Sequence, residues 1–393
     1  MTAVSISKDV IIIGSGPAGM SLACLLAKSG LNIAIIDKSP LTSLDDPKLD
    51  GRDIALTFLS KKILEELGAW DRIASNNISK IRQAKVLDGL SSYSLDFDCE
   101  DVNKDKLGYL VSNRDIKKAI YEKVKTISNI ELFLDHSARV ESLNVDKALV
   151  SYNGKIIESK LVVAADGRFS ESRKLLGIET QMYDHGHVAI VCRMEHEKEH
   201  DDIAYECFLY GETLAVLPLV GKTSSIVITI PPIKADELFN LTEEEFNKYV
   251  ENRFNFRYGK MSLINKRYKY PLVTVYAKSF ISTRFALLGD AAVGMHPVTA
   301  HGYNLALKGA QILSMLLKSA VRQQQDIGGK TVLNSYQRQY NRACHLMYKG
   351  TNAIVWLYTK QYRVTKLMRK IVLRVGNSCF PIKKLIMGQL TDE

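Results

Sequence analysis

The sequence has no long apolar run. Its first apolar stretch, Val10 to Ile13, is interrupted at once by Gly14, and no run of about 18 apolar residues occurs anywhere in the chain. This absence argues against a membrane-spanning helix and against a secretory signal peptide. We therefore expect a cytoplasmic protein that neither crosses a membrane nor is exported by that route.

Paired cysteines are also lacking, because the six cysteines are scattered and none forms a C-x-x-C motif. This spacing excludes a disulfide framework and a cysteine zinc cluster, and we expect no metal site. One zinc-like pattern remains: residues 196–200, "HEKEH", have the H-E-x-x-H spacing of zinc proteases. Their neighbours are charged and lie between strand-like runs, so we interpret the segment as a charged hairpin.

Acidic residues are missing from positions 327 to 391, where twelve basic residues occur. Of the 53 basic and 43 acidic residues in the chain, this tail and its last two residues hold twelve and two, which leaves 41 of each sign in residues 1–326. A basic tail interleaved with aromatic residues and leucines can lie on an anionic membrane, or it can form a solvated helix packed on the core. We favour the membrane surface. No nucleic-acid motif accompanies the charge, so we expect no nucleic-acid partner.

A glycine-rich turn near the amino end carries the first positive signal. A strand ending at Ile13 feeds "GSGPAG", which is followed by a helical stretch, Met20 to Lys28, and by a second strand that ends at Asp37. This order is typical of a dinucleotide-binding unit, in which the glycines allow a tight turn and close approach of a pyrophosphate to the helix N-terminus. Asp37 is then placed to accept hydrogen bonds from a ribose.

The middle of the chain changes character. From His187 to about Val275, β-branched and alternating runs separated by turn residues predict antiparallel strands, with one helical pattern from Thr242 to Arg253. A buried strand and long helices follow. The sequence therefore predicts a cofactor domain that is interrupted by a β-sheet insertion and followed by a helical tail.

Two further motifs complete an ordered set. "ADGRFSESR" occupies residues 165–173, and "RFALLGDAA" at 284–292 is followed by Pro297 and by Gly302-Tyr303-Asn304. Together with the first turn, they resemble the signatures of the flavoprotein aromatic hydroxylases, which are single-component FAD monooxygenases, over essentially the whole chain. "GRDIALT" at 51–57 further resembles the subgroup that hydroxylates ubiquinone precursors. "HPVTAHGYN" at 296–304 is most similar to the demethoxyubiquinol hydroxylases of the UbiM type.

The resemblance implies an α/β fold in which a Rossmann-like FAD-binding domain is interrupted by a β-sheet substrate domain and followed by a helical C-terminal tail. We expect FAD-binding segments at 1–75, 106–180 and 279–330, substrate-domain strands at 76–105, the substrate β-sheet at 181–278, and the basic tail at 331–393.

The resemblance also assigns cofactor-binding roles. The pyrophosphate would lie on the first turn, the adenosine beside the second strand, and the flavin near two arginines and the third motif, with NAD(P)H as a visiting co-substrate. The residues so assigned are Gly14, Ser15, Gly16, Pro17, Ala18, Gly19, Asp37, Lys38, Arg52, Arg114, Val140, Asp166, Gly167, Gly289, Asp290, Pro297, His301, Gly302, Tyr303 and Asn304.

The implied reaction is hydroxylation of a polyprenylated phenol or quinol ring, most similar to that of a 5-demethoxyubiquinol hydroxylase. NAD(P)H would reduce the flavin, O₂ would add to it as a hydroperoxide, and the electron-rich ring would take one oxygen atom. His296, His301 and Tyr205 are the catalytic candidates; for the two histidines, an acid–base role and a flavin-positioning or structural role remain open. The expected place is the cytoplasmic face of the inner membrane, within a ubiquinone-biosynthesis complex.

Three alternatives remain open at this stage. The chain can hydroxylate another ring position or a small soluble phenol, reduce isoprenoid double bonds as geranylgeranyl-type reductases do, or act as a scaffold that keeps FAD only to fold.

Overall fold

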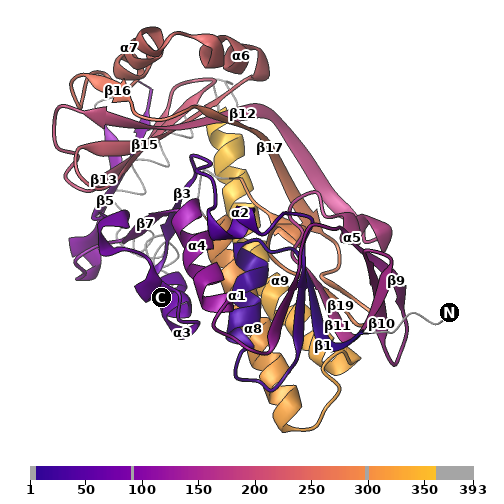
Figure 1. Ribbon diagram of the computed structural model, residues 1–393. Helices are drawn as coiled ribbons and strands as arrows, with labels where there is room; N and C mark the ends of the chain where they lie inside the picture. Colours follow the sequence, from indigo (N-terminus) through magenta and orange to yellow (C-terminus); the bar gives the residue numbers. More distant parts are fainter. Residues whose placement is uncertain (1–5, 90–92, 297–300, 360–393) are drawn as a thin grey trace.

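The computed structural model describes residues 6–89, 93–296 and 301–359. Figure 1 shows two parts, a lower one of helices packed on a parallel sheet and an upper one built on a second sheet, with long strands running between them. Within the described ranges, no helix has both the length and the apolar character needed to span a membrane. This architecture confirms the α/β fold class predicted from the sequence.

The lower sheet has a core of five parallel strands in the order β19-β11-β1-β2-β8. Their bounds are Phe285–Leu287, Lys155–Ala164, Ile6–Ile13, Ile33–Ile36 and Ile130–Phe133. At one edge β18 (Ile281–Ser282) pairs with β19, while β9 (Ala138–Leu143) and β10 (Ala148–Tyr152) form an antiparallel ribbon on β11. The central strands read as continuous apolar runs because their residues are buried on both faces.

Helices stack on this sheet. α1 (Pro17–Leu25) packs against both α4 (Asn113–Val124) and α8 (Gly302–Arg322), and α9 (Lys330–Thr359) packs against α8. The α4 helix begins after a cap at Ser112, whose side chain accepts a hydrogen bond from the Asp115 amide. One long core cluster joins the helices to the sheet.

The upper sheet has the strand order β20-β17-β12-β15-β14-β13-β5-β6, with β16 paired to β12. The bounds are Val293–Gly294, Tyr268–Ala277, Thr180–His196, Thr223–Ile230, Thr213–Pro218, Ile203–Phe208, Gln83–Asp88, Ser94–Asp98 and, for β16, Met261–Leu263. One face packs under α6 (Pro232–Asn240), which the sequence pattern did not predict, and α7 (Glu243–Arg253). The α7 helix begins with a capping box between Thr242 and Glu245.

A small third sheet lies between the two parts. It consists of β3 (Asp53–Leu56), β7 (Gly108–Ser112) and β4 (Ile78–Ile81). The β4 strand was expected among the substrate-domain strands of residues 76–105, but it pairs with β7 instead. Three short helices complete the fold: α2 (Thr42–Asp45), α3 (Phe58–Glu66) and α5 (Glu171–Leu175).

Candidate active site

The three sequence motifs meet at one edge of the lower sheet. Strands β1, β11 and β19 are parallel neighbours. They end at Ile13 and Ala164, immediately before the first two motifs, and at Leu287, just before the Gly289-Asp290 pair of the third. Because parallel strands present their carboxyl ends at the same edge, segments far apart in the sequence lie side by side. The crevice at this edge is where open α/β sheets bind their ligands.

The first turn shows which glycines the protein itself requires. A Cβ at Gly14, where φ is +113°, would lie 2.4 Å from the Ala165 carbonyl oxygen, and one at Gly19 would lie 2.2 Å from the Gly14 carbonyl oxygen. A Cβ at Gly16 would meet no atom within 4 Å. Gly16 therefore borders open space at the start of α1, where unpaired amides and positive potential suit a phosphate.

Asp37 ends β2 beside this turn. Its Oδ2 accepts a hydrogen bond from the Ser15 amide at 2.5 Å, and its Oδ1 accepts one from the Ser39 amide at 2.7 Å. Burial raises the pKa of Asp37, but these hydrogen bonds outweigh it and the net shift is downward. The carboxylate is thus ionised and rigid, and its remaining lone pairs can accept ribose hydroxyls. Lys38 is exposed next to it.

Arg52 and Arg114, the two arginines predicted to lie near the flavin, are located where the lower part of the protein meets the upper sheet. Arg52 forms an ion pair with Asp50, with 2.6 Å between Nη2 and Oδ2, and its guanidinium lies 5.6 Å from the ring centroid of Tyr270. Arg114 pairs with Asp46 at 2.9 Å and helps to line a hollow of about 390 Å³. Both side chains are accessible to a ligand.

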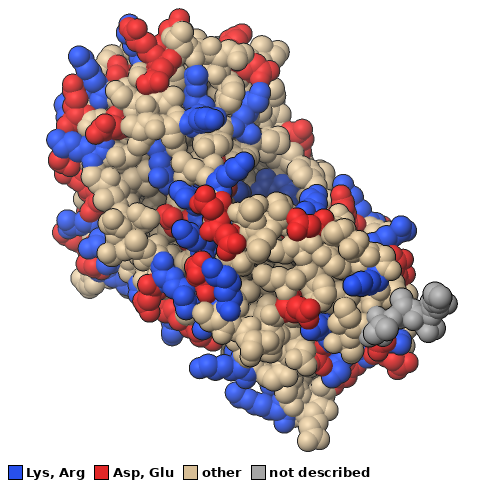
Figure 2. All heavy atoms as spheres, in the orientation of Figure 1, with Lys and Arg blue, Asp and Glu red and all other residues tan. Residues whose placement is uncertain are grey.

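Lys117 in α4 is a further cation that the sequence analysis did not single out. Burial lowers its pKa, Asp37 and Asp50 raise it, and Arg52 lowers it. The net shift of the Lys117 pKa is downward, because burial outweighs its acidic neighbours Asp37 and Asp50. A phosphate bound beside this partly buried ammonium can pair with it. Figure 2 shows a recess between the upper and lower parts with basic side chains inside it.

Asp166 follows β11 and has one unused oxygen. Its Oδ2 accepts a hydrogen bond from the Ser172 amide at 3.1 Å, whereas its buried Oδ1 has no hydrogen-bond partner in the described part of the chain. Buried carboxylate oxygens are rarely left unpaired, so Oδ1 is suited to a donor from a ligand. Gly167, with φ +87°, borders open space.

Two arginines of the second motif bind it to the third. Arg173 is fully buried, and its Nη1 and Nη2 donate to the Ala291 and Arg168 carbonyl oxygens at 2.7 and 3.0 Å. Arg168 in turn pairs with Asp290, with 3.1 Å between Nη2 and Oδ2, and donates to the Val273 carbonyl oxygen at 2.8 Å. The motifs predicted a cofactor-binding role for Asp290 but none for Arg168.

At the start of α8, some residues predicted to bind the cofactor use their side chains to hold the helix in place. Asn304 Oδ1 accepts from the Thr57 amide at 3.2 Å and its Nδ2 donates to the Ala55 carbonyl oxygen at 2.8 Å, while the Tyr303 hydroxyl lies 3.3 Å from Ser21 Oγ. Both side chains therefore hold α8 in place, and a cofactor would meet the backbone amides at Gly302. His301 precedes the helix and is buried. Pro297 lies outside the described residues.

His296 belongs to a cluster of three histidines. Its ring lies 4.8 Å from that of His185, centroid to centroid, and the His187 Nδ1 lies 2.7 Å from the His185 carbonyl oxygen. Burial, with His185, His187 and Arg168 nearby, lowers the pKa of His296 to about 3. His296 is therefore neutral at physiological pH, where it can exchange a hydrogen bond but cannot supply a positive charge.

This geometry fits FAD, and the comparisons agree. The family described as "FAD binding domain" matches residues 7–349. The chain belongs to this family of FAD-binding monooxygenases. It is 43% identical to the ubiquinone hydroxylase UbiM of Neisseria meningitidis, covering 99% of this chain and 85% of the relative, and 32% identical to the ubiquinone hydroxylase UbiL of Rhodospirillum rubrum, covering 96% and 88%.

Solved structures of low sequence identity share the fold. The p-nitrophenol 4-monooxygenase PnpA of Pseudomonas putida superposes with a TM-score of 0.79 over 99% of both chains at 15% identity. PqsL of P. aeruginosa, in complex with 2-aminobenzoylacetate, gives 0.76 over 92% of this chain and 100% of that chain at 19% identity. The family membership confirms FAD as the cofactor of this monooxygenase.

Tyr205 packs apart from the histidine cluster around His296. Its ring packs edge-on against Phe254 and Tyr258, 5.2 and 6.1 Å between centroids, on the side of the upper sheet that α7 covers. Because side chains alternate along a strand, the residues next to Tyr205 in β13 point to the opposite face of the sheet. This packing takes Tyr205 out of the group of catalytic candidates. Val140 is likewise a buried core residue, in β9.

The "HEKEH" segment is neither a helix nor a hairpin. β12 and β13, which it connects, are separated by two strands in the sheet, so the hairpin interpretation was wrong. His196 Nε2 lies 2.9 Å from Ser224 Oγ and His200 Nε2 lies 2.6 Å from the Leu219 carbonyl oxygen, and both rings are buried. Among the described residues, no group of three or more histidine, cysteine or acidic side chains is placed to hold a metal ion.

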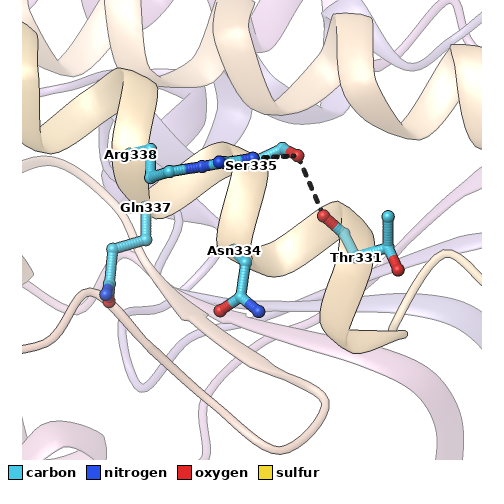
Figure 3. Close-up of a pocket in the computed structure, with 5 residues that line it drawn as sticks. All are labelled: Thr331, Asn334, Ser335, Gln337 and Arg338. Carbon is cyan, nitrogen blue, oxygen red and sulfur yellow. Dashed lines mark hydrogen bonds between the residues drawn. The ribbon is translucent and has the colours of Figure 1, made fainter.

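A shallow hollow on the first turns of α9 has no part in the site. Figure 3 shows its five lining residues on a single helix, where Ser335 Oγ donates to the Thr331 carbonyl oxygen at 2.9 Å. Gln337 accepts hydrogen bonds from Ser279 Oγ and the Phe280 amide at 2.8 and 3.0 Å, which fastens α9 to the lower sheet. The hollow therefore marks a structural contact.

His296→Gln is expected to weaken the acid sensitivity of the fold. The folded-state pKa of about 3 lies below the usual 6.5, so the unfolded chain binds the extra proton and stability falls as pH drops from 6.5 toward 3. Between pH 6.5 and 5 this histidine costs about 2 kcal/mol. Thermal melts from pH 7 to 5 should show a smaller loss of Tm in the variant, whereas the exposed His136→Gln control should follow the wild type. Equal slopes in all three proteins would contradict the assignment.

Proposed function

We propose that this monooxygenase hydroxylates the aromatic ring of a polyprenylated quinol precursor in ubiquinone biosynthesis, at the ring position that 5-demethoxyubiquinol leaves unsubstituted. The observation that carries the proposal is the 43% identity to a ubiquinone hydroxylase along 99% of the chain. The ubiquinone biosynthesis monooxygenase COQ6 of Caenorhabditis elegans, 26% identical over 98% of the chain, supports the same substrate class.

Bound FAD, reduced by NAD(P)H, would supply the transfer of one oxygen atom from O₂ to the ring. The chain's part is to hold the substrate ring against the flavin and to exclude water. His296 and His301 are buried where the third motif meets α8, and a neutral imidazole there can hydrogen-bond the substrate or the flavin edge. Their acid–base role remains a proposal.

Product analysis under ¹⁸O₂ tests the function. With a short-chain demethoxyubiquinol and NADH or NADPH, we expect a product that contains one labelled oxygen atom per turnover. Reduced prenyl double bonds would favour the reductase alternative. Cofactor oxidation that does not respond to the substrate, with no labelled product, would overturn the hydroxylase proposal and favour a scaffold. Quinones formed in hydroxylase-deficient bacteria that express the protein would identify the ring position.

We also propose that the protein works at the cytoplasmic face of the inner membrane, where its basic tail would bind anionic lipid and other enzymes of ubiquinone biosynthesis. The acid-free, basic stretch from residue 327 to 391 supports this, although the residues after Thr359 lie outside the described ranges. If removing residues 360–393 leaves co-sedimentation with anionic vesicles unchanged, the tail is not the membrane anchor.

A further inference from the structure

Glu206 lies in the middle of β13, on the face of the upper sheet opposite α7. Its cross-strand partners are Val86 in β5 and Ala215 in β14. Tyr205 and Cys207 point into the cluster beneath α7, so Glu206 between them points to the other side. Glu206 belongs to none of the three sequence motifs.

That other side faces the segment that carries Arg52. Ala215 pairs with Val227, and Val227 pairs with Val191. These residues therefore lie on the same face of the sheet as Glu206, in a row that crosses the strands. On the same face of the sheet, Arg193 Nη2 binds Asp53 Oδ1 at 2.5 Å.

Tyr270, opposite Ala189, donates its hydroxyl to the Asp50 carbonyl oxygen at 2.6 Å. Asp50 and Asp53 flank Arg52, and the β3 strand that follows accepts a hydrogen bond from Asn304 at the start of α8. The Glu206 side chain thus points from the upper sheet toward the segment around Arg52, which is expected to surround the flavin.

The cross-strand neighbours of Glu206 are apolar. Val86 and Ala215 flank it, and Leu357 near the end of α9 packs on Phe208 and Val86. The end of α9, yellow in Figure 1, rises to this sheet. The next titratable group on this face of β5 is Asp88, opposite Phe208.

Glu206 is half-buried on this face of the sheet. Burial raises the pKa of Glu206 to about 8, against a hydrogen bond with the Thr213 side chain that lowers it. A carboxylate in this environment is a far stronger base than an exposed glutamate, and its pKa approaches the value of about 10 that is typical of a phenol.

We propose that the Glu206 carboxylate is the base that accepts the hydroxyl proton of the substrate ring, so that the ring reacts as a phenolate. This inference rests on the proposed function. The substrate O–H bond breaks, its electron pair stays on the ring oxygen and raises the electron density of the ring, and a new O–H bond forms on Glu206. The proton passes to water when the product leaves.

Phenolate binding can be observed directly in the oxidised holoenzyme with 2-prenylphenol, because a phenolate absorbs at longer wavelength than its phenol. We expect wild type to bind the phenolate at pH 8.5, below the solution pKa of the phenol, and Glu206→Gln to bind the neutral phenol. Glu206→Asp should restore part of the phenolate band. If wild type binds only the neutral phenol, or Glu206→Gln keeps the phenolate, the proposal is overturned.

Turnover gives a second readout. The kcat/KM for hydroxylated product should rise with pH in wild type through an apparent pKa near 8, whereas Glu206→Gln should lose about 10²-fold at pH 8.5 and lack this transition. Glu195→Gln, an exposed glutamate of the same sheet, should match wild type in both readouts. A wild-type enzyme that forms no hydroxylated product refutes the proposed function, while the phenolate band still decides the role of Glu206.

Discussion

Gly16→Ala is expected to yield a folded protein that purifies without FAD. The backbone of Gly16 has an ordinary extended conformation, with φ −68° and ψ 169°, and the added methyl group would meet no protein atom within 4 Å. The methyl group would instead occupy the space from which a pyrophosphate approaches the α1 amides. We expect FAD to bind about 100-fold more weakly, a loss of about 2.7 kcal/mol, by titration of the apoprotein.

Two other glycine substitutions make this result interpretable. Gly19→Ala should destabilise the protein itself, because its Cβ would lie 2.2 Å from the Gly14 carbonyl oxygen. Gly350→Ala, at an exposed position of α9 with no atom within 4 Å of the new Cβ, should keep FAD and the wild-type Tm or slightly more. If Gly16→Ala keeps its bound FAD, the phosphate does not lie against this turn.

Arg173→Met is expected to remove FAD and to destabilise the fold together. The substitution preserves much of the side-chain volume but deletes the donors to the Ala291 and Arg168 carbonyl oxygens. A buried acceptor left without a donor costs about 1–3 kcal/mol, so we expect the free energy of unfolding to fall by about 3 kcal/mol. Arg168 and Asp290 then lose their support, and FAD should dissociate during gel filtration.

Lys174→Met is the matched control. Lys174 is the exposed neighbour of Arg173 in α5, and its side chain makes no hydrogen bond or ion pair with the described residues. Urea unfolding of the two variants, with and without added FAD, should separate local packing from cofactor binding. Arg173→Met with wild-type stability and full flavin content would show that the two motifs hold together without this guanidinium.

The cofactor side of the site was largely predictable from the sequence. A turn such as Gly14–Gly19 depends on local backbone conformation, and the apolar runs at Val10–Ile13 and Leu161–Ala164 predict buried strands wherever they occur. Caps are local as well, so the start of α7 at Thr242 agrees with the sequence prediction. The fold class and FAD followed from these local signals and the order of the motifs.

The substrate side was less predictable because it depends on which face of a strand a residue occupies. Tyr205 was predicted as catalytic and Glu206 was passed over, yet the register of β13 turns Tyr205 toward Phe254 and Glu206 toward the cofactor side. A shift of one residue exchanges the two faces. The sequence contains no signal that sets this register.

The sequence by itself predicted a dinucleotide-binding glycine turn, and it determined that a β-rich block separates the cofactor motifs and that the excess positive charge lies in the tail. Tertiary structure decided which side chains lie beside the motifs and which hold the fold together. Arg168 lies against Asp290 and His185 against His296, while the side chains of Tyr303 and Asn304 hold α8. The reason is physical: a turn is specified by neighbouring residues, whereas partners far apart in the sequence depend on how the sheets and helices pack.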